Sequence, residues 1–404
     1  MKEMKKIVIL GAGYAGLKTV VELQKKAAKT AEITLVEQND YHYEATNLHE
    51  VAAGNVAPER ICFDIQDVLS PAVKLIKDRV VKVDPDAKQI ELAEHAPLNY
   101  DYCVLALGFV SETFGIKGAV ENSLPMANVD QAAQIADHLN EQMVQYRTDH
   151  NPDHLKIIVC GAGFTGIELA GALYDARKRL AKVAEVDPAA IKIKMIDAAP
   201  RILPMFDDKM KDYAIKLMQK EQLTLQGQAA IKEIKPGAVV YQTKDEQLHE
   251  ETAGTIIWTT GVSGSPVMAA SDLPQRRGRV MVTDHLTAPD YDDLYVLGDV
   301  AAVMPPDGKR PYPTTAQIAL TMGIYAAKDL AARVTGGQRP GPYSYHSLGT
   351  VASMGNTHAF GVAMGMKYYG YPASVIKKMI ANKSLIETGG VKELLAKGRF
   401  DLYH

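Results

Sequence analysis

The sequence of 404 residues has little cysteine, no long apolar run and almost no excess of one charge, and each shortage excludes a class of proteins. Its three cysteines, Cys62, Cys103 and Cys160, are too few and too widely spaced for a disulfide framework or a zinc-binding motif. Cys103 and Cys160 stand inside apolar runs, where packing explains them. This cysteine usage is typical of a reducing compartment, and it predicts no metal site.

Continuous apolar sequence is short throughout the chain. No stretch approaches the roughly 18–20 uninterrupted apolar residues of a membrane-spanning helix. The basic start, Met1 to Lys6, resembles that of a signal peptide, but the apolar run behind it is shorter than the ~7–15 residues that such a peptide needs. A formal net charge of −3 also lacks the basic excess of a nucleic-acid-binding domain. We expect two or three domains that are soluble or lie on a surface and bind no nucleic acid.

What the chain does contain is an apolar run that leads directly into a glycine loop and a helix. Lys6 to Leu10 is followed by a G-x-G-x-x-G string from Gly11 to Gly16, and a second apolar run ends at Glu37. In such a unit the glycines allow a tight turn and close approach of a pyrophosphate, and the acid binds ribose hydroxyls. We therefore predict a Rossmann-like dinucleotide-binding unit at the start of the chain.

The same pattern occurs a second time. Leu155 to Cys160 leads into the glycine string Gly161 to Gly166, and a later apolar run ends at Asp197. In each half an apolar strand that ends in glycine closes the unit, at Gly108 and at Gly261. Two such fingerprints predict two nucleotide sites, one in each half of the chain.

A third motif returns the chain to the first unit. A buried-strand pattern ends at Gly-Asp with Asp299, whose carboxylate would face the strand ends where open α/β sheets bind ligands. We therefore expect an α/β fold of two Rossmann-like domains, the second inserted in the first. The expected first domain comprises residues 1–113 and 284–335, the second 114–283, and a C-terminal region 336–404. In the second domain, Asp130 is expected to cap a helix from Gln131 to Gln145.

Taken in order, GAGYAG, Glu37, LALG, GAGFTG, Asp197, WTTG and YVLGDVA resemble the two-dinucleotide-binding flavoproteins related to disulfide reductases. Finer strings, such as GAGFTGIELAG, IIWTTGV and PTTAQIAL, are similar to those of bacterial type II NADH:quinone oxidoreductases. The resemblance covers nearly the whole chain, and no cysteine stands in a motif that would place a thiol against a flavin. It implies a non-proton-pumping enzyme that transfers a hydride from NADH to non-covalently bound FAD and two electrons to a membrane quinone, menaquinone.

The resemblance also implies site residues. FAD would be bound by residues of the first unit, the last long helix and the tail, namely Gly11, Gly13, Ala15, Gly16, Glu37, Thr46, Gly108, Asp299, Ala316, Gln317 and Lys377. NADH would be bound by Gly161, Gly163, Gly166, Glu168, Asp197 and Gly261, and the quinone by Gln317, Thr321 and Ile380. Glu168, Gln317 and Lys377 are the expected catalytic residues.

Three of these residues carry further expectations. A carboxylate at Asp197 repels a 2′-phosphate and so favours NADH over NADPH, a preference that Arg201 could soften unless it is structural. Glu168 has a structural alternative, since an acid in the first helical turn also stabilises the helix dipole. The resembled family carries A-Q-x-A-x-Q in the last long helix, and this chain has Thr321 in place of the second glutamine. That departure leaves the details of quinone binding open.

The tail is basic and amphipathic. Between Lys367 and His404 there are seven lysines and arginines against three acids, a local net charge of +4. Apolar stripes at helical spacing lie beside the lysines, namely Val375, Ile376, Met379 and Ile380, then Val391, Leu394 and Leu395. Basic amphipathic helices bind anionic membrane surfaces, although an ordinary packed or dimerising helix pair is an alternative. We expect the tail to hold the protein on the cytoplasmic face of the cell membrane, and the resemblance implies a homodimer.

Two other functions stay open. If Thr321 abolishes quinone binding, the chain would be a soluble FAD-dependent NADH:acceptor reductase that uses oxygen or a small acceptor. A non-catalytic FAD/NADH redox sensor is the second alternative, although the intact second glycine string argues against it.

Overall fold

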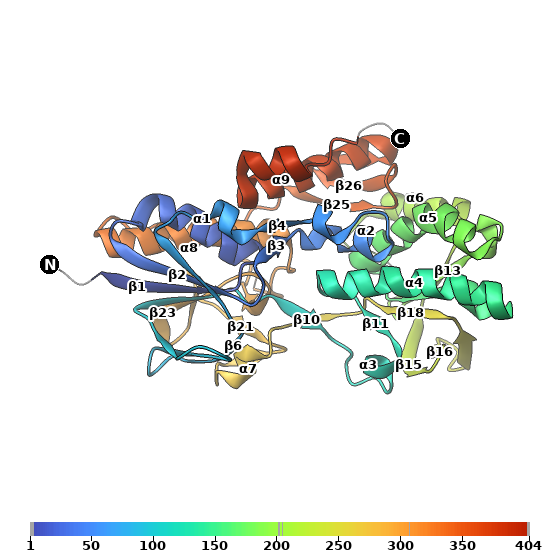
Figure 1. Cartoon of the computed structure of the whole chain (residues 1–404), viewed down its shortest axis with the longest axis horizontal. Coiled ribbons are helices and arrows are strands. Elements are labelled where there is room, and N and C mark those ends of the chain that lie inside the picture. The colour runs from blue at the N-terminus through green and yellow to red at the C-terminus, as the bar shows by residue number, and fades with distance from the viewer. Residues whose placement is uncertain (1–3, 201–202, 204, 307, 402–404) are drawn as a thin grey trace.

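The computed structural model describes residues 4–200, 203, 205–306 and 308–401. Figure 1 shows two α/β units side by side, with the C-terminal helix α9 above their junction. The first unit is built on a six-stranded sheet in the order β22-β23-β9-β1-β2-β5. Its strands are β1 (Lys5–Leu10), β2 (Ala31–Glu37), β5 (Val73–Lys77), β9 (Tyr102–Leu105), β22 (Thr287–Ala288) and β23 (Tyr291–Val296). All pairs except β22–β23 are parallel, as in a Rossmann-like sheet.

Helices α1 (Tyr14–Ala27) and α8 (Ala316–Thr335) pack together against this sheet (Figure 1). Ile7 to Leu10 are buried without alternation, because a parallel strand in the middle of such a sheet is covered on both faces. The two helices approach closely at Gly323, where a Cβ atom would lie 2.6 Å from the carbonyl oxygen of Ala15. The remaining elements of this unit are β6 (Val80–Asp84), β7 (Gln89–Leu92), β8 (Leu98–Asn99), α7 (Val267–Ala270), β20 (Gln275–Arg276), β21 (Arg279–Met281) and β24 (Ala301–Ala302).

The second unit repeats this plan. Its five-stranded parallel sheet has the order β11-β18-β12-β13-β14. The strands are β11 (Leu124–Pro125), β12 (Lys156–Cys160), β13 (Lys192–Ile196), β14 (Leu223–Gln226) and β18 (Thr255–Trp258), and the other elements are α3 (Ala119–Asn122), α4 (Val129–Asp149), α5 (Phe164–Ala184), α6 (Asp208–Lys220), β15 (Ala229–Lys235), β16 (Ala238–Thr243) and β17 (Leu248–Thr252). The expected α/β fold with two Rossmann-like sheets is confirmed. Asp130 was the wrong cap, because α4 begins earlier and the Asn128 side chain accepts from the amide of Gln131.

The chain passes between the units through β10 (Phe109–Ser111) and β19 (Val262–Gly264), which pair antiparallel. Beyond β19, Met268, Leu273 and Val280 lie in the core of the first unit. The return therefore comes well before the expected boundary at residue 283. Its physical reason is the packing of α7 on β6, where the amide of Val83 donates to Ser271 Oγ at 2.9 Å.

The C-terminal region contacts both units. It consists of β25 (Gly349–Ser353), β26 (Ala359–Ala363), β27 (Met366–Tyr369) and α9 (Gly370–Lys397), whose helical geometry is interrupted at Gly390. Phe360 packs in the core of the second unit, whereas Leu385 packs in that of the first. The segment after β2, with β3 (Tyr41–Tyr43), α2 (Leu48–Ala52) and β4 (Cys62–Asp64), lies beneath α9 (Figure 1). Within the described residues, no helix has the length and apolar character to cross a membrane.

Candidate active site

The first glycine loop has the geometry that a pyrophosphate site requires. Gly11 has a φ of +97°, and a Cβ atom on it would collide with the carbonyl of Ala106. A Cβ atom on Gly16 would collide with the carbonyl of Gly11, so the helix start can lie this close only with glycine. Gly13 has no heavy atom within 4 Å of its would-be Cβ, which leaves its backbone open to a ligand at the N-terminus of α1. The loop therefore fits a dinucleotide.

The second loop repeats this geometry. Gly161 has a φ of +108°, a Cβ atom on Gly166 would collide with the carbonyl of Gly161, and Gly163 again faces open space. Gly108 and Gly261 end the corresponding strand regions with φ values of +67° and +80°. The repetition extends to backbone conformation, which supports two nucleotide sites of the same type.

A carboxylate fastens each loop to the neighbouring strand. Glu37 Oε2 accepts a hydrogen bond from the amide of Ala12 at 2.6 Å, and Asp197 Oδ2 accepts one from the amide of Ala162, also at 2.6 Å. Burial raises the pKa of Glu37, although the backbone amides that donate to Glu37, among them that of Ala12, oppose the rise. Both acids stand where a ribose would meet the loop. Arg201, which was expected near Asp197, lies outside the described residues.

The Gly-Asp turn, the first glycine loop and the start of α8 converge. Gly298 has a φ of +67°, and its would-be Cβ lies 3.3 Å from Ala15 Cβ and 4.0 Å from Ala319 Cβ. Asp299 follows directly, and burial raises its pKa to about 6 against the opposing charge of Arg279. In the part of the chain that the structure describes, no group is hydrogen-bonded to this carboxylate. It therefore fits the role of binding hydroxyl groups of a ligand in the first loop.

Glu168 and Lys377 form a buried ion pair between α5 and α9. Lys377 Nζ lies 2.7 Å from Glu168 Oε1, and the amide and hydroxyl of Ser353 donate to the same oxygen at 3.0 and 3.1 Å. Burial would raise the pKa of Glu168, but Lys377, His49 and the Ser353 amide outweigh it, so that the pKa is lowered. The carboxylate is thus held ionised by the tail. The alternative of a first-turn acid that stabilises the helix dipole is wrong, because α5 has no acid in its first turn. This contact joins two of the predicted catalytic residues.

His49 on α2 lies beside this ion pair, and no role was predicted for it from the sequence. Its Nδ1 lies 4.0 Å from Glu168 Oε2, and its Nε2 lies 3.5 Å from Ser353 Oγ. Burial lowers the pKa of His49 despite the nearby carboxylates. A small hollow opens here, lined by residues that include His49, Ser353 and Lys377. Its polar lining can handle protons close to the junction of the two units.

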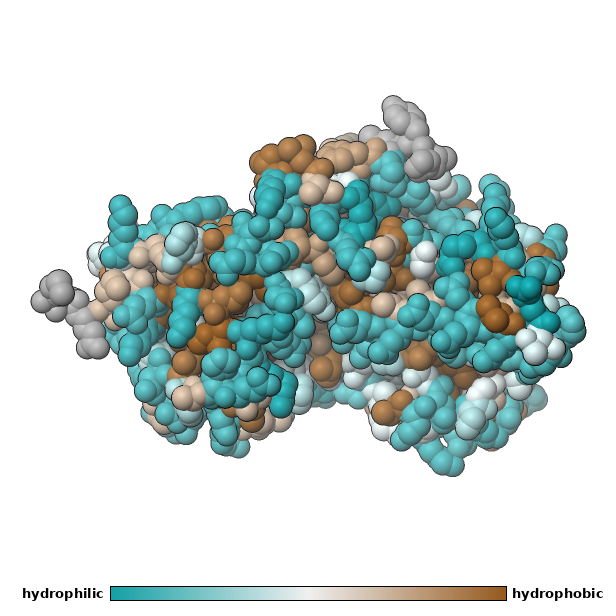
Figure 2. All heavy atoms as spheres, in the orientation of Figure 1, coloured by the Kyte–Doolittle hydropathy of each residue, from teal (hydrophilic) through white to brown (hydrophobic). Residues whose placement is uncertain are grey.

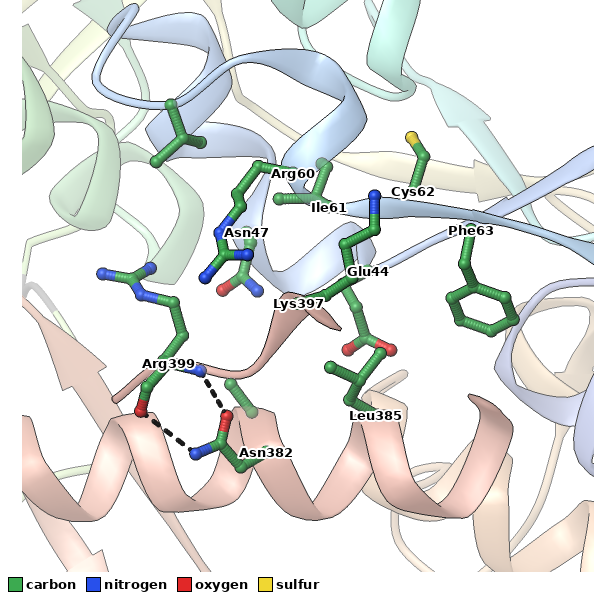
Figure 3. Close-up of a pocket in the computed structure, with 12 residues that line it drawn as sticks. Glu44, Asn47, Arg60, Ile61, Cys62, Phe63, Asn382, Leu385, Lys397 and Arg399 are labelled. Atoms are coloured by element: carbon green, nitrogen blue, oxygen red, sulfur yellow. Dashed lines mark hydrogen bonds between the residues drawn. The ribbon is translucent and has the colours of Figure 1, made fainter. Parts of the chain in front are cut away.

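A second hollow lies between α9 and the segment around β4 (Figure 3). Asn382 on α9 exchanges hydrogen bonds with the backbone of Arg399, at 3.1 and 2.6 Å. Glu44 is buried on the opposite side, where its carboxylate accepts from Tyr14 OH at 3.0 Å and from Thr388 Oγ1 at 3.5 Å. Tyr14 belongs to the first glycine loop, and Thr388 belongs to α9. Glu44 therefore connects that loop to the tail.

Gln317 and Thr321 on α8 are hydrogen-bonded to the segment that precedes β25 and not to the cluster around Glu168. Gln317 Oε1 accepts from Tyr345 OH at 2.7 Å and from the amide of Leu348 at 2.9 Å. Thr321 Oγ1 lies 2.8 Å from Tyr343 OH. The structure thus joins Glu168 to Lys377, whereas Gln317 and Thr321 bind the segment that precedes β25.

The tail differs from an ordinary surface helix, because some of its lysines point inward and several of its apolar side chains are exposed. Some of its cations turn inward, where Lys377 binds Glu168 and Lys378 donates to the carbonyl of Asp401 at 2.6 Å. The side chains of Lys367, Lys383 and Lys392 are more than half exposed. Among the described residues of the tail, the large apolar side chains that are exposed are Tyr371, Met379, Ile380, Ile386, Val391, Leu395 and Phe400. Figure 2 shows hydrophobic side chains on the outer surface of α9. Of the expected stripes, Val375, Ile376 and Leu394 are half-buried, and Ile376 packs against a cluster that includes Val351 and Ala359 of the C-terminal region.

Comparisons with known proteins extend this description. Residues 5–323 match the family model described as pyridine nucleotide-disulphide oxidoreductase. The chain is 37% identical to a type II NADH:quinone oxidoreductase of Staphylococcus saprophyticus over 404 residues, covering 99% of this chain and 100% of the relative. It is 38% identical to that of Staphylococcus haemolyticus over 403 residues, with the same coverage.

Solved structures share the fold at lower identity. NDH2 of Plasmodium falciparum in complex with NADH superimposes with a TM-score of 0.85 at 15% identity, covering 98% of this chain and 100% of that one. The sulfide:quinone oxidoreductase of Aquifex aeolicus gives a TM-score of 0.78 at 21% identity, covering 99% of this chain and 96% of that one. At these identities the likeness supports the arrangement of the units and no particular residue.

The ion pair predicts a pH-dependent loss of stability. In Lys377→Met, Glu168 stays buried without its cation, so its pKa rises and its charge becomes unfavourable. We expect the free energy of unfolding to fall by about 3 kcal/mol near neutral pH. The lowered pKa of Glu168 in the parent adds stability above its unfolded-state pKa, which is lost as pH falls through the folded-state value. In the variant the pKa of Glu168 is raised instead of lowered. Its loss of unfolding free energy relative to the parent should therefore be largest at alkaline pH and shrink in acid.

Denaturant unfolding at several pH values measures this effect. Lys383→Met is the matched control, since it removes a lysine of the same helix that is 58% exposed in its ion pair with Glu387. A deficit that is equal at all pH values, or equal in the two variants, would contradict the assignment of the ion pair.

Proposed function

The chain belongs to the pyridine nucleotide-disulphide oxidoreductase family and, with 36–38% identity along its whole length, to the type II NADH:quinone oxidoreductases. From this premise we propose that it oxidises NADH and reduces a membrane quinone, with menaquinone as the acceptor and without pumping protons. The observation that carries the proposal is the duplicated loop: two glycine turns of the same conformation, each fastened by a carboxylate, in units joined by one tail.

The first unit, closed by Asp299, is assigned to FAD and the second to NADH. The FAD-binding residues would be Gly11, Gly13, Ala15, Gly16, Glu37, Thr46, Gly108, Asp299 and Ala316, with Gln317 and Lys377 nearby, and those for NADH Gly161, Gly163, Gly166, Glu168, Asp197 and Gly261. When bound, FAD would accept a hydride from NADH and pass two electrons to the quinone. The glycine loops present backbone amides to the pyrophosphates, and Glu37 and Asp197 orient the ribose hydroxyls.

Reduction of a quinone by two electrons also consumes two protons. Lys377 is a hydrogen-bond donor beside Glu168, and their ion pair stands next to His49 and Ser353 in a polar cluster. The cluster supplies acid and base groups where α9 meets the second unit. We assign Lys377 and Glu168 to proton handling for the acceptor.

The tail brings the protein to its lipid substrate. Exposed apolar side chains along α9, including Ile380, suit insertion among lipid chains, and a quinone would enter beside them. We propose a monotopic protein on the cytoplasmic face of the membrane, acting as a homodimer.

Anaerobic stopped-flow absorbance tests the function. NADH should bleach the flavin of the holoprotein, and a menaquinone analogue should restore its colour much faster than oxygenated buffer does. Faster recovery with oxygen, or equal slowness with both, would indicate a soluble NADH:acceptor reductase. A flavin that NADH does not bleach would indicate a sensor.

Asp197 should set the preference for NADH. Asp197→Asn keeps an oxygen for the amide of Ala162 but removes the charge that repels a 2′-phosphate. We expect the ratio of kcat/KM for NADH to that for NADPH to fall at least tenfold, about 1.4 kcal/mol. Because a folding defect lowers both values together, an unchanged ratio would refute the role of Asp197.

The tail is tested best without truncation, because α9 carries buried Leu385 and the ion-paired Lys377. Instead, Val391→Ser with Leu395→Ser alters side chains that are 65% and 74% exposed. Binding to anionic vesicles should weaken at least tenfold, because each side chain buries apolar surface in lipid. The control is Val120→Ser with Leu248→Ser, which are 72% and 66% exposed on the second unit. Equal vesicle binding by both variants and the parent in a sedimentation assay would contradict the proposal.

A further inference from the structure

One polar stripe of α8 is covered by an extended segment that neither the fold nor the proposed chemistry explains. Gln317, Thr321, Tyr325 and Asp329 follow one another at intervals of four and therefore lie on one face of the helix. Residues 339–348, which lead from the end of α8 toward β25, run back along this face. We call this segment the strap.

Four side chains of α8 bind the strap in order. Arg339 Nε donates to Asp329 Oδ1 at 2.7 Å, and Tyr325 OH donates to the carbonyl of Gly341 at 2.9 Å. Tyr343 OH lies 2.8 Å from Thr321 Oγ1, and Tyr345 OH donates to Gln317 Oε1 at 2.7 Å.

This register follows from the dimensions of the two backbones. Four residues of an α-helix rise by roughly 6 Å, and two residues of an extended chain by roughly 6.6 Å. Every second strap residue from Arg339 to Tyr345 therefore meets every fourth residue of α8. The pattern ends at Gln317, next to the convergence of α8 with the first glycine loop.

At this last position the strap fixes one orientation of the Gln317 amide. The backbone amide of Leu348 can only donate, so the Gln317 atom that it meets is the carbonyl oxygen, Oε1. Tyr345 OH donates to the same oxygen, so both of its lone pairs are used. Within the described residues, no acceptor is hydrogen-bonded to Gln317 Nε2. The side chain is left with N–H donors alone for a ligand.

We propose that Tyr345 is a positioning residue that holds Gln317 with its Nε2 directed at a carbonyl oxygen of the quinone. This inference rests on the proposed function, since it names the group that recognises the acceptor. Thr321 strengthens it, because its hydroxyl donates to the carbonyl of Ile318 and is bound to Tyr343, so that it is not free for the acceptor. Recognition of the carbonyl then depends on one amide, whose orientation Tyr345 and Leu348 determine.

The test is Tyr345→Phe in the holoprotein, which removes the hydroxyl and keeps the ring that packs edge-on against Tyr312. Loss of one hydrogen bond that orients the amide should weaken binding of a non-reducible quinone analogue roughly fivefold. Reoxidation of the flavin by the quinone should slow by a similar factor, while its reduction by NADH and the thermal midpoint stay unchanged. Tyr325→Phe is the matched control, because it removes a strap-bound hydroxyl two helical turns away.

A double-mutant cycle separates positioning from other roles. With Gln317→Ala in place, Tyr345→Phe should cost no further affinity, since its effect acts through the missing amide. An effect that persists there, or a Tyr345→Phe variant that binds the analogue like the parent, would overturn the inference. A changed FAD affinity or flavin spectrum with unchanged analogue binding would assign the amide to the flavin and overturn it likewise. If quinone fails to reoxidise even the parent flavin, the proposed function itself fails.

Discussion

The buried ion pair between Glu168 and Lys377 is the contact on which the assembly of this protein depends. A carboxylate buried on α5 needs a partner, and the lysine that pairs with Glu168 comes from α9, far along the chain. The same helix reaches the first unit through Thr388 and Glu44. One helix thus contacts a buried carboxylate in each of the two units. The two units are positioned by the tail as well as by the paired strands β10 and β19.

The duplication of the glycine loop shows how few constraints a nucleotide site needs. In both units a glycine with positive φ ends the first strand, another glycine lets the helix start close by, and an acid on the next strand binds the loop amide. Glu37 and Asp197 differ in length, yet each accepts at 2.6 Å. What differs between the sites is the surroundings, since α8 and Asp299 border the first loop and α5 leads from the second to the tail.

Local geometry explains what could be predicted from the sequence. The two sheets, the loops and the positions of Glu37 and Asp197 follow from strand patterns and glycine spacing within short segments. The early return of the chain to the first unit after β19 could not be predicted, because it depends on the packing of α7 against β6, a contact with no local signal in the sequence. Nor could the partners of Gln317 be predicted, because the alternating tyrosines of the strap contact α8 only once the fold brings that helix beside them. The basic, apolar tail was recognised as amphipathic, but its inward-facing lysines depend on acids from other elements, such as Glu168.

The match between helix and strap also limits how this chain can vary. Since alternate strap residues face α8, deletion of a single residue after Gly341 would turn Tyr343 and Tyr345 away and present their neighbours, Ser344 and His346, to the helix. Substitutions in the strap change one contact at a time, whereas a change of length by one alters every contact beyond it. Among descendants of this sequence, the strap should therefore keep its length more strictly than its composition, and length changes should come in pairs of residues.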